Sequence, residues 1–146
     1  KDIIEVTPEN IIEHKEDIVQ VPDLALRDEG GWFAGSNRGE WGGELVYLPD
    51  NGEPQIIVRE NIEDIYRLGD SIIVTSGLSH LGMSDGVIYR LSKINDEQWK
   101  ANVWIQLPGA PISSWFVESG ELLINLNPGG SILLSEDGIL RVAECL

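Results

Sequence analysis

Histidine, cysteine and methionine are almost missing from this 146-residue chain, which holds two His, one Cys and one Met. The lone Cys145 cannot form a disulfide within the chain, and this favours a reducing cytoplasm over an oxidising compartment. His14 and His80 lie far apart in sequence and supply too few ligands, with one cysteine, for a zinc site. We therefore expect no metal and no other cofactor.

Basic residues and long apolar runs are also scarce. Ten Lys and Arg stand against 25 Asp and Glu, so the formal net charge is −15. A field of this sign repels nucleic acid and anionic lipid and attracts basic proteins. No apolar run approaches the roughly 18 residues that cross a membrane. The composition predicts a basic protein partner, no nucleic acid and no membrane, with solubility alone as the other interpretation of the charge.

The first residue is Lys1 rather than Met, as it would be after removal of a signal peptide or after trimming. We expect a cytoplasmic protein. The periplasm is the alternative if a signal peptide was removed.

Sequence motifs that carry catalysis are missing too. Residues 76–80 do not form the Gly-x-Ser-x-Gly turn of serine hydrolases. Gly30-Gly31 and Gly42-Gly43 lack the following helix that a phosphate loop needs, and residues 50–53 lack the alternating oxygen ligands of an EF-hand. Two of the 25 acids could still converge as in glycoside hydrolases, which sequence does not reveal. We predict a protein without catalytic residues.

The chain does contain an internal repeat. Residues 62–91 recur as residues 112–142, so that Ile62 aligns with Ile112, Ile65 with Trp115, and the triplet 72–74 with the triplet 122–124. A weaker copy comes earlier, with Asp23-Leu24 matching Asp64-Ile65 and residues 32–34 matching the apolar triplet. The repeat predicts three copies of one structural unit.

Short runs of β-branched and aromatic residues, separated by Gly, Pro, Asn and Asp, predict an all-β fold. Twelve strands are expected, at 18–21, 31–34, 44–48, 55–59, 63–67, 71–75, 86–92, 101–106, 112–117, 121–125, 131–134 and 138–143. The continuous apolar run at 72–74 is typical of a strand covered on both faces. Residues 1–20 are expected to form an N-terminal arm with a short helix that begins after Thr7-Pro8.

Twelve strands in three repeats give four strands per repeat, in one domain with repeats at 21–59, 60–107 and 108–146. The marker glycines Gly43, Gly86 and Gly138 are spaced as in four-stranded propeller blades. The pattern resembles β-propeller blades, although the Trp-Asp and kelch signatures are missing. This resemblance implies three four-stranded antiparallel sheets stacked as a partial, propeller-like array. Because closed propellers need at least about four blades, the open array would invite a partner; a larger assembly, a barrel and a sandwich are the alternatives.

The tryptophans separate core from surface. Trp32, Trp104 and Trp115 fall in expected strands and are predicted to lie in the core. Trp41 lies in the glycine-rich, polar loop 34–43 and has the composition of an interface anchor, with a fold-back over the neighbouring repeat as the alternative. If the repeats are equivalent, the corresponding loops emerge on one rim and display together Arg38, Glu40, Trp41, His80, Met83 and Asp85. Glu60, Glu63 and Asp64 are expected to add acid elsewhere at the blade ends.

The profile resembles the immunity proteins of contact-delivered bacterial nuclease toxins in size, single-domain build, acidity and the lack of a catalytic set. This resemblance implies an acidic inhibitor that binds a cognate basic toxin domain, such as an RNase, and covers its active site. The alternative is a partial β-propeller binding or scaffold module of the cell envelope. A hydrolase or lyase on a propeller-like frame is the third possibility.

Overall fold

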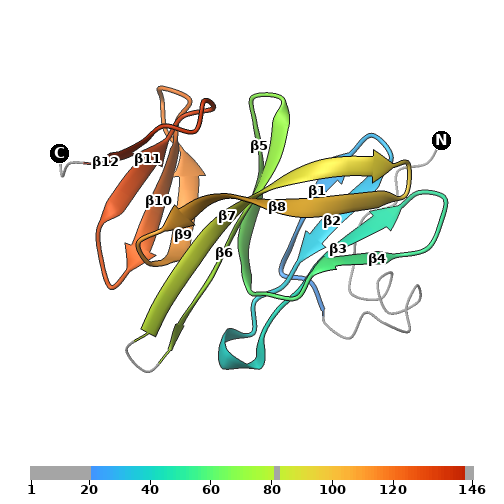
Figure 1. Ribbon diagram of the computed structural model, residues 1–146, viewed down its shortest axis with the longest axis horizontal. Helices are drawn as coiled ribbons and strands as arrows, with labels where there is room; N and C mark the ends of the chain where they lie inside the picture. The colour runs from blue at the N-terminus through green and yellow to red at the C-terminus, as the bar shows by residue number, and fades with distance from the viewer. Residues whose placement is uncertain (1–20, 81–82, 144–146) are drawn as a thin grey trace.

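The computed structural model describes residues 21–80 and 83–143. These residues form three four-stranded antiparallel sheets, as the repeat predicts, and the sheets follow one another along the long axis of the molecule (Figure 1). The expected N-terminal helix falls in residues 1–20 and lies outside the described residues. No helix in the part of the chain that the structure describes is long and apolar enough to cross a membrane.

Each sheet pairs its strands in chain order, so every connection within a sheet is a hairpin. The first sheet contains β1 (Leu24–Asp28), β2 (Gly31–Gly35), β3 (Leu45–Pro49) and β4 (Gln55–Val58), with a 3₁₀ turn η1 (Gly39–Trp41) between β2 and β3. The second sheet contains β5 (Ile62–Leu68), β6 (Ser71–His80), β7 (Met83–Asn95) and β8 (Gln98–Leu107). The third sheet contains β9 (Ala110–Phe116), β10 (Leu122–Asn127), β11 (Ser131–Leu134) and β12 (Leu140–Val142).

Two of the strand predictions need correction. The first strand of the array is β1 (Leu24–Asp28) rather than 18–21; Val21 lies outside any strand, and residues 18–20 are outside the described part. Residues 77–80 and 83–85, expected to belong to a loop, instead extend β6 and β7, with Gly77 paired to Gly86 and His80 to Met83. The polar, glycine-containing stretch carries no apolar alternation, so its strand character is set by cross-strand pairing rather than by propensity.

The middle sheet is covered on both faces, which explains its continuous apolar run. Ile72 and Val74 pack toward the first sheet with Phe33 and Tyr47, whereas Ile73 packs toward the third sheet. All five of these side chains are almost fully buried. Because successive strand residues point to opposite faces of a sheet, residues 72–74 reach both neighbouring sheets. Each fully buried aliphatic side chain of this kind contributes about 1.5–3 kcal/mol to folding. The predicted two-sided burial of residues 72–74 is therefore confirmed.

The tryptophans divide differently from the prediction. Trp99 is buried and makes an edge-on contact with Phe33, 4.9 Å between ring centroids. Trp32 and Trp104 are half-buried at the margins of the packed faces. The prediction that Trp115 lies in the core is wrong, because this side chain is 50% exposed.

The reason for the Trp115 error is one extra residue in a turn. Tyr66 pairs with Ile73 in the second sheet, and Trp115 pairs with Leu123, the repeat counterpart of Ile73. Four residues separate the pair Arg67–Ile72, but five separate the pair Phe116–Leu122. A one-residue shift along a strand moves a side chain to the other face of the sheet. Trp115 therefore occupies the position in the third sheet that Tyr66 occupies in the second sheet. This position lies on the face of the third sheet that points away from the second.

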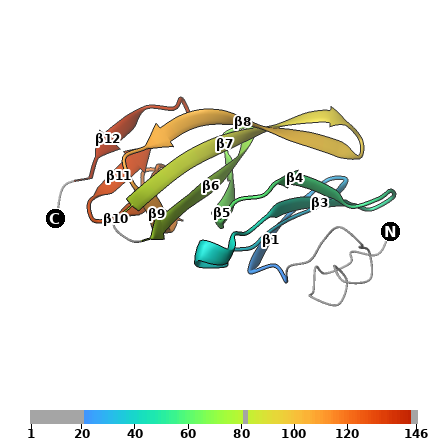
Figure 2. The same ribbon diagram turned by 60° about the horizontal axis from the view of Figure 1, so that its bottom comes forward.

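The connections between the second and third strands of the three sheets lie along one side of the array, which we call the rim. The turn η1 and the end of the β6–β7 hairpin project at the same side of the molecule in both views (Figures 1 and 2). The hydroxyl of Ser84, near the start of β7, donates to the carbonyl of Asn127 at the end of β10, 2.5 Å away. The third connection therefore lies beside the second.

Candidate protein-binding site

The turn η1 carries the most exposed large apolar side chain of the described residues. Trp41 is 82% exposed at the end of this turn. Gly39 allows the turn because its φ of +58° lies in the left-handed region, which side chains disfavour. Gly43 allows the chain to return, since a Cβ there would stand 2.1 Å from the carbonyl oxygen of Ser36. Backbone geometry thus holds Trp41 in solvent.

A buried asparagine attaches this turn to the second sheet. The side chain of Asn61 accepts a hydrogen bond from the Arg38 amide, 2.9 Å, and donates to the carbonyl of Gly39, 2.7 Å. Asn61 is only 5% exposed and stands directly before β5. Both hydrogen bonds join Asn61 to the loop that carries Trp41. The position of this loop therefore depends on that of β5. Sequence reasoning missed Asn61; its place in the short link between two repeats was the available signal.

A recess beside η1, which we call the rim pocket, encloses about 460 Å³. Its walls come from the first and second sheets and combine acidic, basic, aromatic and aliphatic side chains: Glu40, Arg59, Glu60, Asp85, Tyr89 and Val103. The Tyr89 hydroxyl donates a hydrogen bond to a carboxylate oxygen of Glu60. Burial is the main cause that raises the pKa of Tyr89 well above its ordinary value, and the contact with the Glu60 carboxylate raises it further. Tyr89 therefore stays protonated and acts as a donor.

The structure brings some of the predicted site residues together. Glu40, Glu60 and Asp85 all line the rim pocket and all are exposed. Glu60 was expected elsewhere on the blade ends, and the structure places it beside the rim residues instead. Arg38 and Trp41 lie in the adjoining loop and are exposed. Only the backbone is described for His80 and Met83, which pair with each other near the tip of the β6–β7 hairpin.

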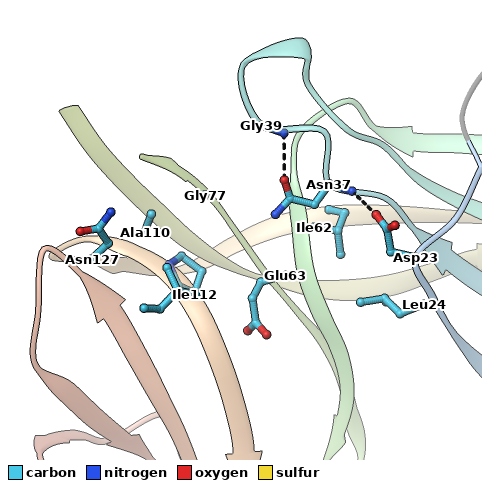
Figure 3. Close-up of a pocket in the computed structure, with 11 residues that line it drawn as sticks. Asp23, Leu24, Asn37, Gly39, Ile62, Glu63, Gly77, Ala110, Ile112 and Asn127 are labelled. Atoms are coloured by element: carbon cyan, nitrogen blue, oxygen red, sulfur yellow. Dashed lines mark hydrogen bonds between the residues drawn. The ribbon is translucent and has the colours of Figure 1, made fainter. Parts of the chain in front are cut away.

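Glu63 and Asp64 lie away from this group, where the three sheets meet. Glu63 lines a second cavity of about 490 Å³, the axial pocket, whose walls come from all three sheets and include Asp23, Leu24, Asn37, Ile62 and Ile112 (Figure 3). The two pockets are adjacent, because Gly39 and Gly77 line both. Asp64 accepts a hydrogen bond of 3.0 Å from the hydroxyl of Tyr66. Sequence reasoning missed Asp23, although the repeat had aligned it with Asp64.

Two hydroxyls hold the carboxylate of Glu63. Its Oε1 accepts from Thr75 Oγ1 on β6, 2.9 Å, and from Ser114 Oγ on β9, 2.7 Å. Burial raises the pKa of the Glu63 carboxyl, and the neighbouring Asp64 adds to this effect, while the two hydroxyls oppose it. The site therefore holds one oriented and partly desolvated carboxylate.

Within residues 21–80 and 83–143, no three His, Cys, Asp or Glu side chains converge in a way that could hold a metal ion. The oriented, partly buried carboxylate of Glu63 can bind a cation or exchange a proton.

No family model, no curated protein and no solved structure matches this chain.

Proposed function

We propose that this protein binds a basic protein partner through the rim and, by covering the partner's active site, neutralises it, with a toxin nuclease domain as the partner. The observation that carries this proposal is Trp41, 82% exposed beside an acid-lined recess. Large aromatic side chains are the residues that most often dominate binding energy at interfaces. Because hydrogen bonds to Asn61 already hold the backbone of this loop, binding through Trp41 avoids the cost of ordering the loop.

The charge of the chain supports the same role. With a net charge of −15, the protein attracts a basic partner over a distance and accelerates their encounter. A nuclease needs basic residues to hold phosphates, so the side chains that bind its substrate would also meet Glu40, Glu60 and Asp85. The proposed role is binding without catalysis, in the cytoplasm that the toxin enters.

The test uses catalytically inactivated, basic nuclease toxin domains from the strain that encodes this chain. Affinity and association rate are measured against salt concentration for the wild-type protein and two matched triple variants. The rim variant carries Glu40→Gln, Glu60→Gln and Asp85→Asn. The control variant carries Glu53→Gln, Asp70→Asn and Glu97→Gln, three exposed acids of the same types in the turns at the opposite ends of the strands.

We expect binding that weakens steeply with salt, and a slower association for the rim variant than for the control variant. Trp41→Ala should raise the Kd about 30-fold, because hot-spot aromatic residues contribute about 2 kcal/mol or more. Melting temperature should not change, since the side chain packs little in the free protein. The active nuclease should lose its RNA- or DNA-cleaving activity at one equivalent of inhibitor. Absence of binding at low salt would remove the proposal.

A second candidate function, a binding or scaffold module, is favoured by the outer face of the third sheet. Trp115 and Leu123 occupy the positions that Tyr66 and Ile73 occupy in the second sheet. There Tyr66 contacts the next sheet, with its ring centroid 5.2 Å from that of Phe116. The outer face of the third sheet therefore resembles a face that contacts another sheet. It lies at the end of the array, and Trp115 on it is half exposed. Binding of the partner that is lost in Trp115→Ser but kept in Trp41→Ala would favour this candidate.

A further inference from the structure

The axial pocket has a composition that suits one kind of ligand. Its aliphatic walls come from different sheets: Leu24 from the first, Ile62 from the second and Ile112 from the third. None of the described residues that line it is a lysine or an arginine. At about 490 Å³ it has room for a long side chain, and Figure 3 shows the Glu63 carboxylate directed into the space between Leu24 and Ile112.

The carboxylate is oriented by its neighbours and one of its oxygens is available. Thr75 and Ser114 both donate to Oε1, the first from β6 of the same sheet and the second from β9 of the third sheet. Among the described residues nothing donates to Oε2, and this atom is not enclosed in the protein interior. Asp23 on the opposite wall is directed toward the loop, where its Oδ2 accepts from the Asn37 amide, 2.7 Å (Figure 3). Of the two acids among the described residues that line the cavity, Glu63 is therefore the one whose carboxylate is directed into it.

A partly desolvated carboxylate beside an aliphatic wall complements an alkyl chain that ends in a cation. The alkyl part displaces water from the walls, and the cation lies against Oε2, where the reduced dielectric strengthens the attraction. Burial already raises the pKa of Glu63, and a cation in the pocket would stabilise its charged form.

We propose that the axial pocket accepts a lysine or arginine side chain, whose terminal cation pairs with Glu63 while its stem lies on Leu24, Ile62 and Ile112. The source of that side chain rests on the proposed function: it belongs to the basic partner that binds the adjacent rim. The complementarity between the pocket and such a side chain does not depend on the proposed function. Trp41 would then contact the surface of the partner at the rim, and Glu63 would bind one of the partner's basic side chains inside the axial pocket.

The experiment titrates the full chain with small probes. N-acetyl-arginine amide and N-acetyl-lysine amide supply the cation, and N-acetyl-citrulline amide supplies the same shape as the arginine probe without charge. Amide chemical shifts of Leu24, Ala110 and Ile112, which line this pocket but not the rim pocket, report binding. Glu63→Gln keeps an oxygen that accepts from Thr75 and Ser114 but removes the charge. Glu97→Gln, an exposed acid in the β7–β8 turn, is the matched control.

We expect saturable shifts at these amides with the arginine or lysine probe, at least tenfold weaker binding of citrulline, and a similar loss in Glu63→Gln. Glu97→Gln should bind like the wild type. Equal binding of citrulline, unchanged binding in Glu63→Gln, or shifts confined to residues outside the pocket would each overturn the proposal.

The outcomes of this titration can be distinguished from those of the nuclease-binding test of the proposed function. Probe binding without any affinity for a basic nuclease would remove the function and keep the pocket. Nuclease binding that depends on Trp41 but not on Glu63 would keep the function and remove the pocket. A melting temperature of Glu63→Gln measured alongside shows that the variant is folded.

Discussion

The stacking of the first two sheets makes a prediction about tryptophan replacements. Trp99 on β8 is 8% exposed and contacts two aromatic side chains of the first sheet, with ring centroids 4.9 Å from Phe33 and 5.9 Å from Tyr47. Its main chain is held separately, because Gln55 accepts from the Trp99 amide, 2.8 Å, and donates to its carbonyl, 2.7 Å. Trp99→Ala therefore removes the inter-sheet packing and leaves the backbone hydrogen bonds in place.

The size of the effect follows from burial. Replacing a buried tryptophan by alanine costs about 3–5 kcal/mol of folding free energy, since the transfer and cavity contributions add. At about 2–4 °C per kcal/mol for a chain of this length, a loss of about 4 kcal/mol lowers Tm by about 8–16 °C. Trp115→Ala, at 50% exposure, should cost about 1–2 kcal/mol. Trp41→Ala, at 82% exposure, should stay within about 0.5 kcal/mol of wild type.

The assay is urea unfolding followed by far-ultraviolet circular dichroism, which does not depend on the number of tryptophans that remain. The m-value should be equal in all three variants, so that differences in midpoint report stability alone. The reasoning would be refuted by equal losses for Trp99 and Trp115, or by a loss above about 1.5 kcal/mol for Trp41, because either result would contradict the burial that defines the array.

Two further predictions concern the contacts between sheets. Because burial raises the pKa of Glu63, the folded state holds this proton more tightly than the unfolded chain, and its contribution to stability falls as pH rises from the unfolded pKa of about 4.3 through the folded pKa. Glu63→Gln lacks this loss, so its Tm relative to wild type should increase across that interval in melts between acidic and neutral pH, and a constant difference would contradict the assignment. Gly77→Ala should cost about 2–3 kcal/mol, because a Cβ there would lie 2.3 Å from the Asp85 carbonyl oxygen and 2.7 Å from Pro111 Cδ. Gly39→Ala, with no atom within 4 Å of the added Cβ but a φ of +58°, should cost about 1 kcal/mol; equal losses in urea titrations would show that the close approach of the third sheet does not matter.

Much of the fold follows from local sequence. Short apolar runs and the turn residues between them predicted the strands that bury Phe33, Val74 and Ile124. The internal repeat carried information that propensity did not: it aligned Asp23-Leu24 with Asp64-Ile65, and Leu24 begins β1. Propensity alone had placed that strand at 18–21, because Arg27 and Asp28 are unfavourable in a strand read by itself.

The candidate site could be predicted only in part. Gly39, Gly42 and the polar residues around Trp41 indicated an exposed loop, since such a segment has too few apolar side chains to bury a tryptophan. Sequence did not indicate that Glu60 lies beside Glu40 and Asp85, because those residues come from different sheets and meet only when the sheets pack.

What the sequence by itself determined is the repeating unit: strand periodicity, turn chemistry and the three apolar copies are local properties of neighbouring residues. What only the tertiary structure decided is which face each side chain takes and which distant residues share a cavity. One extra residue in the β9–β10 turn moved Trp115 to an open face, and the packing of three sheets directed Glu63 into a pocket rather than to a blade end. Both outcomes depend on register and inter-sheet contact, which connect residues far apart in the chain.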